Sequence, residues 1–198
     1  MDSYKLSRAR EQQWQELVHS YIQEAEEQGW SYEPEIVETI VVLRLFGITI
    51  YKASMGISEL FAYPWVSIKR AGLNEEEQLV RLAWEEAQKQ RELKQLPRDQ
   101  IDGLFYKYHR MKDALISKHL EERGILLQHL TAFYAKHQVP YDRVLTLQDM
   151  QYTATLESQG AQFQILASPQ ERQEKLLEYQ QEMQQFTEFL KHAYFSAP

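Results

Sequence analysis

The sequence of 198 residues contains no cysteine, only 7 glycines and 6 prolines, and no long uninterrupted apolar segment. The lack of cysteine excludes disulfides, thiolate metal sites and cysteine nucleophiles. No apolar run approaches the roughly 20 residues that cross a bilayer, and residues 1–14 lack the apolar core of a secretory signal peptide. We therefore expect a cytoplasmic protein that makes no contact with a membrane.

Positive charge is not concentrated anywhere in the chain. The 22 basic residues are outnumbered by 29 acidic ones, the net charge is −7, and no segment is strongly basic. Proteins that hold nucleic acid through its phosphates carry a dense Lys/Arg surface. Residues 105–112 interleave aromatic and basic side chains, but Lys107 and Arg110 fall at the edge of a helical apolar stripe, where long basic side chains ordinarily cover apolar surface. Nucleic acid is therefore not an expected partner.

Metal-binding signatures are also missing. The six histidines are scattered along the chain, and neither an HExxH sequence nor a histidine pair four residues apart occurs. The closest sequence, His119 to Arg123, lacks the second histidine. A metal site needs two or three convergent ligands. We therefore expect no metal and no cofactor.

Apolar residues recur three and four positions apart over most of the chain, which is typical of amphipathic helices. The spacing predicts helices over residues 6–28, 34–46, 75–96, 98–137 and 169–195. Asn74 followed by Glu77 suggests a capping box, and Ser168, Pro169 and Glu171 form the clearest helix start in the sequence.

The fourth predicted helix contains a polar run over residues 119–124. A glycine inside a helix costs about 1 kcal/mol relative to alanine. Gly124 therefore predicts a break or kink in this helix near residue 124.

Short β-branched and aromatic runs predict strands over residues 48–52, 64–69, 144–147, 152–157 and 162–167, with residues 158–161 as the tight connection of a hairpin. A lone hairpin is only marginally stable. We therefore expect the strands before and after the long central helices to share one small antiparallel sheet. The predicted fold is a single, predominantly helical α+β domain.

Two parts of the chain resemble a family of uncharacterised bacterial proteins. In that family a V-V-A-L-N-x-x-G helix leads to a strand ending in S-C-x-G-H, with P-W-V shortly after. The corresponding sequences here are VVLRLFG (41–47), ITIY (48–51), ASMGI (53–57) and PWV (64–66), and EMQQFTEFL (182–190) resembles the family's last helix. Ser54 stands in place of the family's cysteine and Ile57 in place of its histidine. The resemblance implies a shared scaffold and a bacterial origin, without the reactive thiol and imidazole.

The strand-to-loop turn after residue 51 is the candidate binding site. Lys52, Ser54 and Gly56 could meet an anion through a charge, a hydroxyl and a backbone amide, and Tyr63 and Trp65 combine large contact area with a polar tip. No phosphate-loop motif is present, so a plain connection between strands is the alternative interpretation.

Two hypotheses about function follow. The first is a non-catalytic binding protein that engages a protein partner, including a second copy of itself, or a small ligand near residues 52–65. The second is an enzyme that acts on a nucleotide or another anionic substrate at the loop from Lys52 to Tyr63. It requires a base near the hydroxyl of Ser54.

Overall fold

The structure is a computed structural model, and it describes residues 2–27, 34–56, 63–69, 73–150, 153–161, 163 and 167–196. The elements follow in the order α1 (Asp2–Glu27), α2 (Pro34–Leu45), β1 (Ile50–Ser54), β2 (Trp65–Lys69), α3 (Leu73–Leu93), α4 (Arg98–Tyr134), the 3-10 turn η2 (Tyr141–Arg143), β3 (Leu145–Met150), β4 (Thr153–Ser158) and α5 (Pro169–Ser196). The predicted class, a predominantly helical α+β fold with a small antiparallel sheet, is confirmed.

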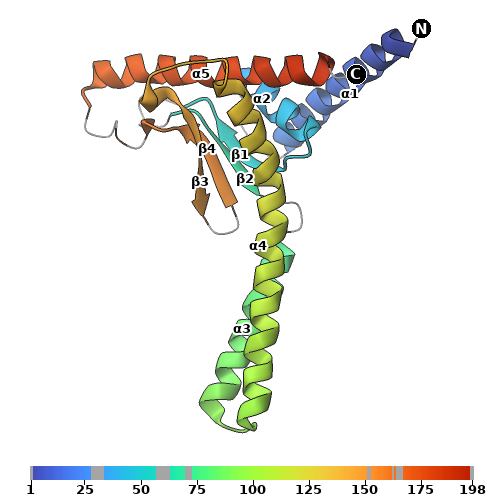
Figure 1. Cartoon of the computed structure of the whole chain (residues 1–198), viewed down its shortest axis with the longest axis vertical. Coiled ribbons are helices and arrows are strands. Elements are labelled where there is room, and N and C mark those ends of the chain that lie inside the picture. Colours follow the sequence, from blue (N-terminus) through green and yellow to red (C-terminus); the bar gives the residue numbers. More distant parts are fainter. Residues whose placement is uncertain are drawn as a thin grey trace.

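The molecule consists of a head and an arm (Figure 1). In the head, α5 lies across one side of the sheet beside α2. Helix α1 extends from the end of the head where α5 terminates. The arm is an antiparallel helical hairpin formed by α3 and residues 98–124 of α4, and it projects away from the head. The remainder of α4 belongs to the head.

All four strands form one antiparallel sheet in the order β1-β2-β4-β3. The central pairing joins β2, which precedes the arm, to β4, which follows it. The prediction that strands from both sides of the long helices share one sheet is therefore confirmed. This arrangement fixes the base of the arm beside the sheet, because the chain leaves from β2 and returns to β3.

The predicted pairing of residues 152–157 with 162–167 is wrong. The hairpin consists instead of β3 and β4, with Leu147 opposite Leu156. After β4 the chain turns back on η2, where the amide of Gln159 donates to the carbonyl of Val144 and the amide of Gly160 to that of Asp142, both at 2.8 Å. Residues 162 and 164–166 lie outside the described residues, and residues 163 and 167 are not in a strand.

One hydrophobic core joins the sheet to the helices of the head. It contains the fully buried residues 41–43 of α2, which explains why that helix is apolar on nearly all sides. The other main contributors are Trp14, Tyr21, Ile36, Ile40, Ile48, Val66, Ile68, Leu126, Leu130, Phe133, Leu156, Met183, Phe186 and Leu190. Because α4 contributes its last turns to this core, the arm has a rigid base.

The glycine and capping signals fix two helix boundaries. At the end of α2, Gly47 has φ +77° and its amide donates to the carbonyl of Arg44. The amide of Ile48 donates to the carbonyl of Leu43, and these two hydrogen bonds form a Schellman motif. At the start of α5, Ser168 and Glu171 form the predicted capping box, with reciprocal bonds of 3.3 and 2.8 Å. These two signals act locally, so the sequence alone predicts them correctly.

The first helix of the arm, α3, starts and ends earlier than predicted. It begins at Leu73, so Asn74 lies inside its first turn rather than at the N-cap, and it ends at Leu93 instead of residue 96. Lys94 follows with φ +50°, the left-handed conformation that ends many helices.

The predicted break near Gly124 is also wrong, because α4 continues without interruption from Arg98 to Tyr134. No described atom comes within 4 Å of a Cβ built at Gly124, so the glycine is not needed for close packing. The helix is held on both sides of this position, by Leu115 in the arm and Leu126 in the core. This packing outweighs the modest local cost of one glycine. His119, the first residue of the polar run, is buried.

Within the described residues, every helix falls short of the length or the apolar character that crossing a membrane requires.

Candidate functional site

The β1–β2 pairing brings part of the predicted site together. Ser54, the last residue of β1, lies directly opposite Trp65, the first residue of β2. Beyond it Gly56 is buried, has φ +88°, and donates its amide to the hydroxyl of Ser54 at 3.0 Å. The hydroxyl and the amide that could have bound an anion are therefore bonded to each other.

The other side of this turn packs against α5. The side-chain amide of Gln180 donates to the carbonyl of Met55 at 2.9 Å. Tyr63 is buried and its ring meets that of Tyr179 edge to face, with centroids 5.3 Å apart. These contacts explain the aromatic residue before Pro64 as part of a small second core that contains Ala161 and Leu176.

Lys52 lies apart from these groups. It is exposed on β1, an edge strand, and its ammonium lies 5.4 Å from the ring centroid of Tyr51. Among the described residues, no imidazole or carboxylate lies within hydrogen-bond distance of the Ser54 hydroxyl. The base required by the enzyme hypothesis is therefore not supplied by the described parts of the long helices. Residues 57–62 of the loop lie outside the described residues.

Replacement of Ser54 by alanine tests how this turn is held. We expect Ser54→Ala to lower the free energy of unfolding by about 1 kcal/mol, because the buried amide of Gly56 loses its acceptor. Urea unfolding followed by circular dichroism measures the loss, and Ser67→Ala on β2 is the control, with an expected change below about 0.5 kcal/mol. Equal effects of the two changes would contradict this account of the turn.

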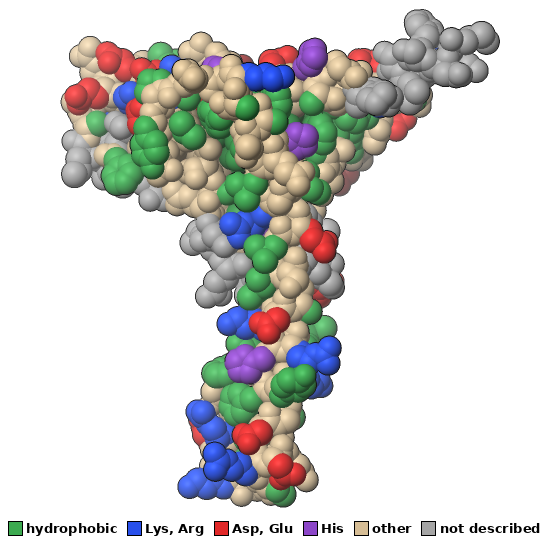
Figure 2. Space-filling model, in the orientation of Figure 1, with side chains coloured by type: hydrophobic (Ala, Val, Ile, Leu, Met, Phe, Trp, Pro, Cys, Tyr) green, Lys and Arg blue, Asp and Glu red, His purple; other side chains and the backbone are tan. Residues whose placement is uncertain are grey.

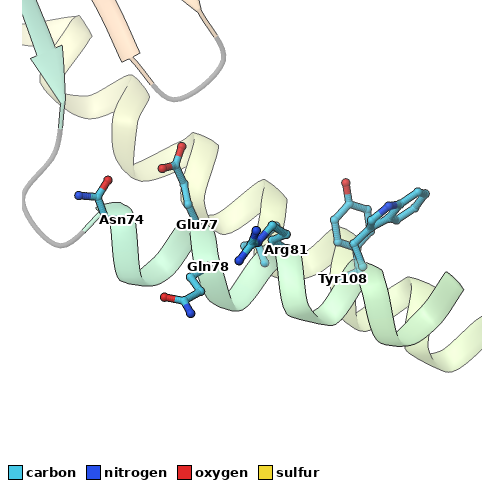
Figure 3. Close-up of a pocket in the computed structure, with 7 residues that line it drawn as sticks. Asn74, Glu77, Gln78, Arg81 and Tyr108 are labelled. Atoms are coloured by element: carbon cyan, nitrogen blue, oxygen red, sulfur yellow. The ribbon is translucent and has the colours of Figure 1, made fainter. Parts of the chain in front are cut away.

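The arm has a core of its own. Trp84 of α3 packs against Tyr108 and Phe105 of α4, with ring centroids 4.9 and 5.6 Å apart. Val80 and Leu115 are buried beside them. A hollow of about 550 Å³ lies on one side of this contact, lined by Asn74, Glu77, Gln78, Val80, Arg81, Trp84 and Tyr108. Figure 3 shows the polar and aromatic side chains that line it, from Asn74 at the start of α3 to Tyr108 of α4.

A row of exposed side chains that includes three leucines runs along the outside of α3. Leu79, Leu82 and Leu93 are 56%, 47% and 48% exposed, and Glu86 and Lys89 lie between them. At 100° per residue these five positions share one side of the helix, about 140° away from the side that packs on α4. We call these five residues the outer stripe. Nothing in the described fold covers its leucines.

The arm carries half of the large exposed apolar side chains of the described chain. Besides the outer stripe these include Trp84, Tyr106 and Leu120, and Figure 2 shows apolar side chains continuing along the arm. Sequence reasoning missed the outer stripe because the core-facing residues of α3 already account for one apolar face. The spacing 79, 82, 86, 89, 93 alternates three and four, but two of the five residues are charged, so the stripe stands out only once the side that packs on α4 is known.

A fully buried carboxylate lies within the described part of the head. Glu182 of α5 is 0% exposed; it accepts a hydrogen bond from the hydroxyl of Tyr134 at 2.9 Å and lies 3.3 Å from Nε2 of His137 and 3.5 Å from Arg143. The hydroxyl of Tyr134 in turn accepts the amide of Leu145 at 2.7 Å. Burial raises the pKa of Tyr134, so this hydroxyl stays protonated and keeps donating. The cluster joins the end of α4, η2, β3 and α5, and its geometry fits a structural role.

No group of three or more histidine, aspartate or glutamate side chains within the described part of the chain could hold a metal ion.

Comparison of the chain with protein-family models, with curated proteins and with solved structures finds no match in any of the three. The resemblance noted from the sequence stays a prediction, and the function has to be inferred from the molecule itself.

Proposed function

We propose that this protein acts by binding another protein through the arm. The observation that carries the proposal is the outer stripe: three leucines, each about half exposed, lie in a row on a helix whose opposite side is already packed. Scattered exposed apolar residues are ordinary, but an aligned row on a projecting element is typical of a contact surface.

The shape of the molecule supports the same proposal. The arm extends away from the head, so a partner can reach α3 without displacing the sheet or α5 (Figure 1). The hairpin has an internal aromatic core, so it is a preformed surface that loses little conformational entropy on binding.

We place the contact on the arm rather than at residues 52–65. The amide of Gly56 and the hydroxyl of Ser54 bond each other, the carbonyl of Met55 accepts from Gln180, and Tyr63 is buried against Tyr179. A small ligand at this turn would have to replace those contacts.

Site-specific photo-crosslinking tests the proposal. A photoreactive amino acid replaces Leu82 on the outer stripe or, as the matched control, Leu177, which is 61% exposed on α5. Expressed in the cells that naturally make the protein, the arm variant is expected to give one defined cross-linked protein that the control does not. The product is identified by mass spectrometry.

The specificity of that product is checked by adding Leu79→Glu and Leu93→Glu to the photoreactive variant. These changes place charges on both sides of position 82 and are expected to reduce the yield at least fivefold. Equal yields from positions 82 and 177, or a yield that the added glutamates leave unchanged, would contradict binding through the arm.

A further inference from the structure

The outer stripe has a pattern that complements itself. Its five positions follow the three-four spacing of core positions in a coiled coil, with leucines toward both ends and the pair Glu86 and Lys89 in the middle. Both charged residues are exposed, and Lys89 has no ion-pair partner among the described residues. A partner helix that suits this stripe must offer leucines at its ends and a complementary pair of charges at its centre.

The same helix, running in the opposite direction, meets that requirement. When Leu82 lies against Leu93 of the second copy, the three-four spacing places Glu86 against Lys89 of the second copy. Two-fold symmetry repeats both contacts, so two leucine pairs enclose two ion pairs. Parallel pairing would instead place Glu86 against Glu86 and Lys89 against Lys89.

The charges toward the ends of α3 agree with this direction. Its first turn carries Glu75 and Glu76, whereas Arg91, Lys94 and the following Arg98 give the tip of the arm its basic side chains. Figure 2 shows Lys and Arg side chains gathered at that tip. Antiparallel pairing brings the basic tip of each arm toward the acidic start of the other.

We infer that the partner of the outer stripe is a second copy of this chain, and that two copies pair through antiparallel α3 helices. This inference rests on the proposed function and names its partner.

The contact is small, which sets the strength to expect. With Leu82 opposite Leu93, the two α3 helices overlap over residues 82–93, about 18 Å, and a strip about 10 Å wide gives roughly 180 Å² per copy. A standard stable interface buries about 800 Å² per partner. The pairing is therefore expected to be weak, reversible and dependent on concentration.

Sedimentation equilibrium on the full chain, from about 5 to 500 µM, tests the inference. The wild-type chain is expected to show a monomer–dimer equilibrium. The variants Glu86→Lys and Lys89→Glu are each expected to weaken it at least tenfold, because each sets like charges against one another. The double variant with both changes is expected to regain most of the affinity, and an equimolar mixture of the two single variants is expected to form a heterodimer.

Two leucine changes complete the experiment. Leu82→Glu is expected to leave a monomer, and Leu177→Glu, a matched change on exposed α5, is expected to leave the equilibrium unchanged. Because all these side chains are exposed, circular dichroism should show that each variant keeps its fold.

A wild-type chain that stays monomeric at 500 µM would overturn the self-pairing. A dimer that survives Leu82→Glu, or a double variant no better than either single one, would overturn it as well. In those cases a cross-link from position 82 to a different protein would still support binding through the arm. A monomer with no arm-specific cross-link would remove both proposals.

Discussion

Gly160→Ala should lower the free energy of unfolding by roughly 3 kcal/mol, because the turn after β4 has no room for a methyl group. A Cβ at this position would lie 2.7 Å from Cβ of Asp142 and 3.0 Å from its carbonyl oxygen, and closer still to the hydroxyl of Tyr179. The backbone cannot move aside easily, since the amide of Gly160 bonds the carbonyl of Asp142. Denaturant unfolding measures the loss.

The matched control is Gly103→Ala in the arm. Nothing in the described structure lies within 4 Å of a Cβ there, and Gly103 is inside α4, so alanine should raise stability by about 0.5–1 kcal/mol. The two identical chemical changes should thus act with opposite signs. A Gly160→Ala protein as stable as the wild type would show that this close approach is not required.

Glu182→Ala should be at least as damaging, with an expected loss of roughly 4 kcal/mol. The change removes the acceptor of the Tyr134 hydroxyl and leaves the guanidinium of Arg143, which is largely buried, without its carboxylate. Glu182→Gln keeps an acceptor for Tyr134 but loses the charge, so its loss should be intermediate. Thermal and urea unfolding of the three proteins give the ranking.

Glu188→Ala serves as the control on the same helix. Its carboxylate is exposed and pairs with Lys191 at 2.8 Å, and exposed ion pairs contribute little, so a loss below about 1 kcal/mol is expected. If Glu182→Ala lowered the free energy of unfolding no more than Glu188→Ala, the buried cluster around Glu182 would not be important for the stability of the head.

Local signals in the sequence predicted much of the fold. Gly47, Pro169 and the Ser168–Glu171 capping box mark boundaries that depend only on neighbouring residues, and the structure has them as expected. The shared antiparallel sheet also followed from the sequence, because isolated hairpins are too weak to persist.

The errors arose where distant contacts decide the outcome. After β4 the chain is turned by bonds from residues 159 and 160 to the carbonyls of Val144 and Asp142, which no local pattern reveals. Similarly, α4 continues through Gly124 because two separate packing regions hold it. Of the candidate binding residues, the turn at Ser54 could be recognised but its internal hydrogen bond could not, and the outer stripe becomes visible only when the side facing α4 is known.

The uninterrupted course of α4 gives the molecule a mechanical property. A single rod of 37 residues, about 55 Å long, has one end embedded among the phenylalanines of the head and the other at the tip of the hairpin. A tilt of about 5° at the embedded end would swing the tip by roughly 3.5 Å, given about 40 Å of projecting length. The rod is thus a lever, and a force applied at its free end is transmitted as torque to the packing contact between α4 and α5.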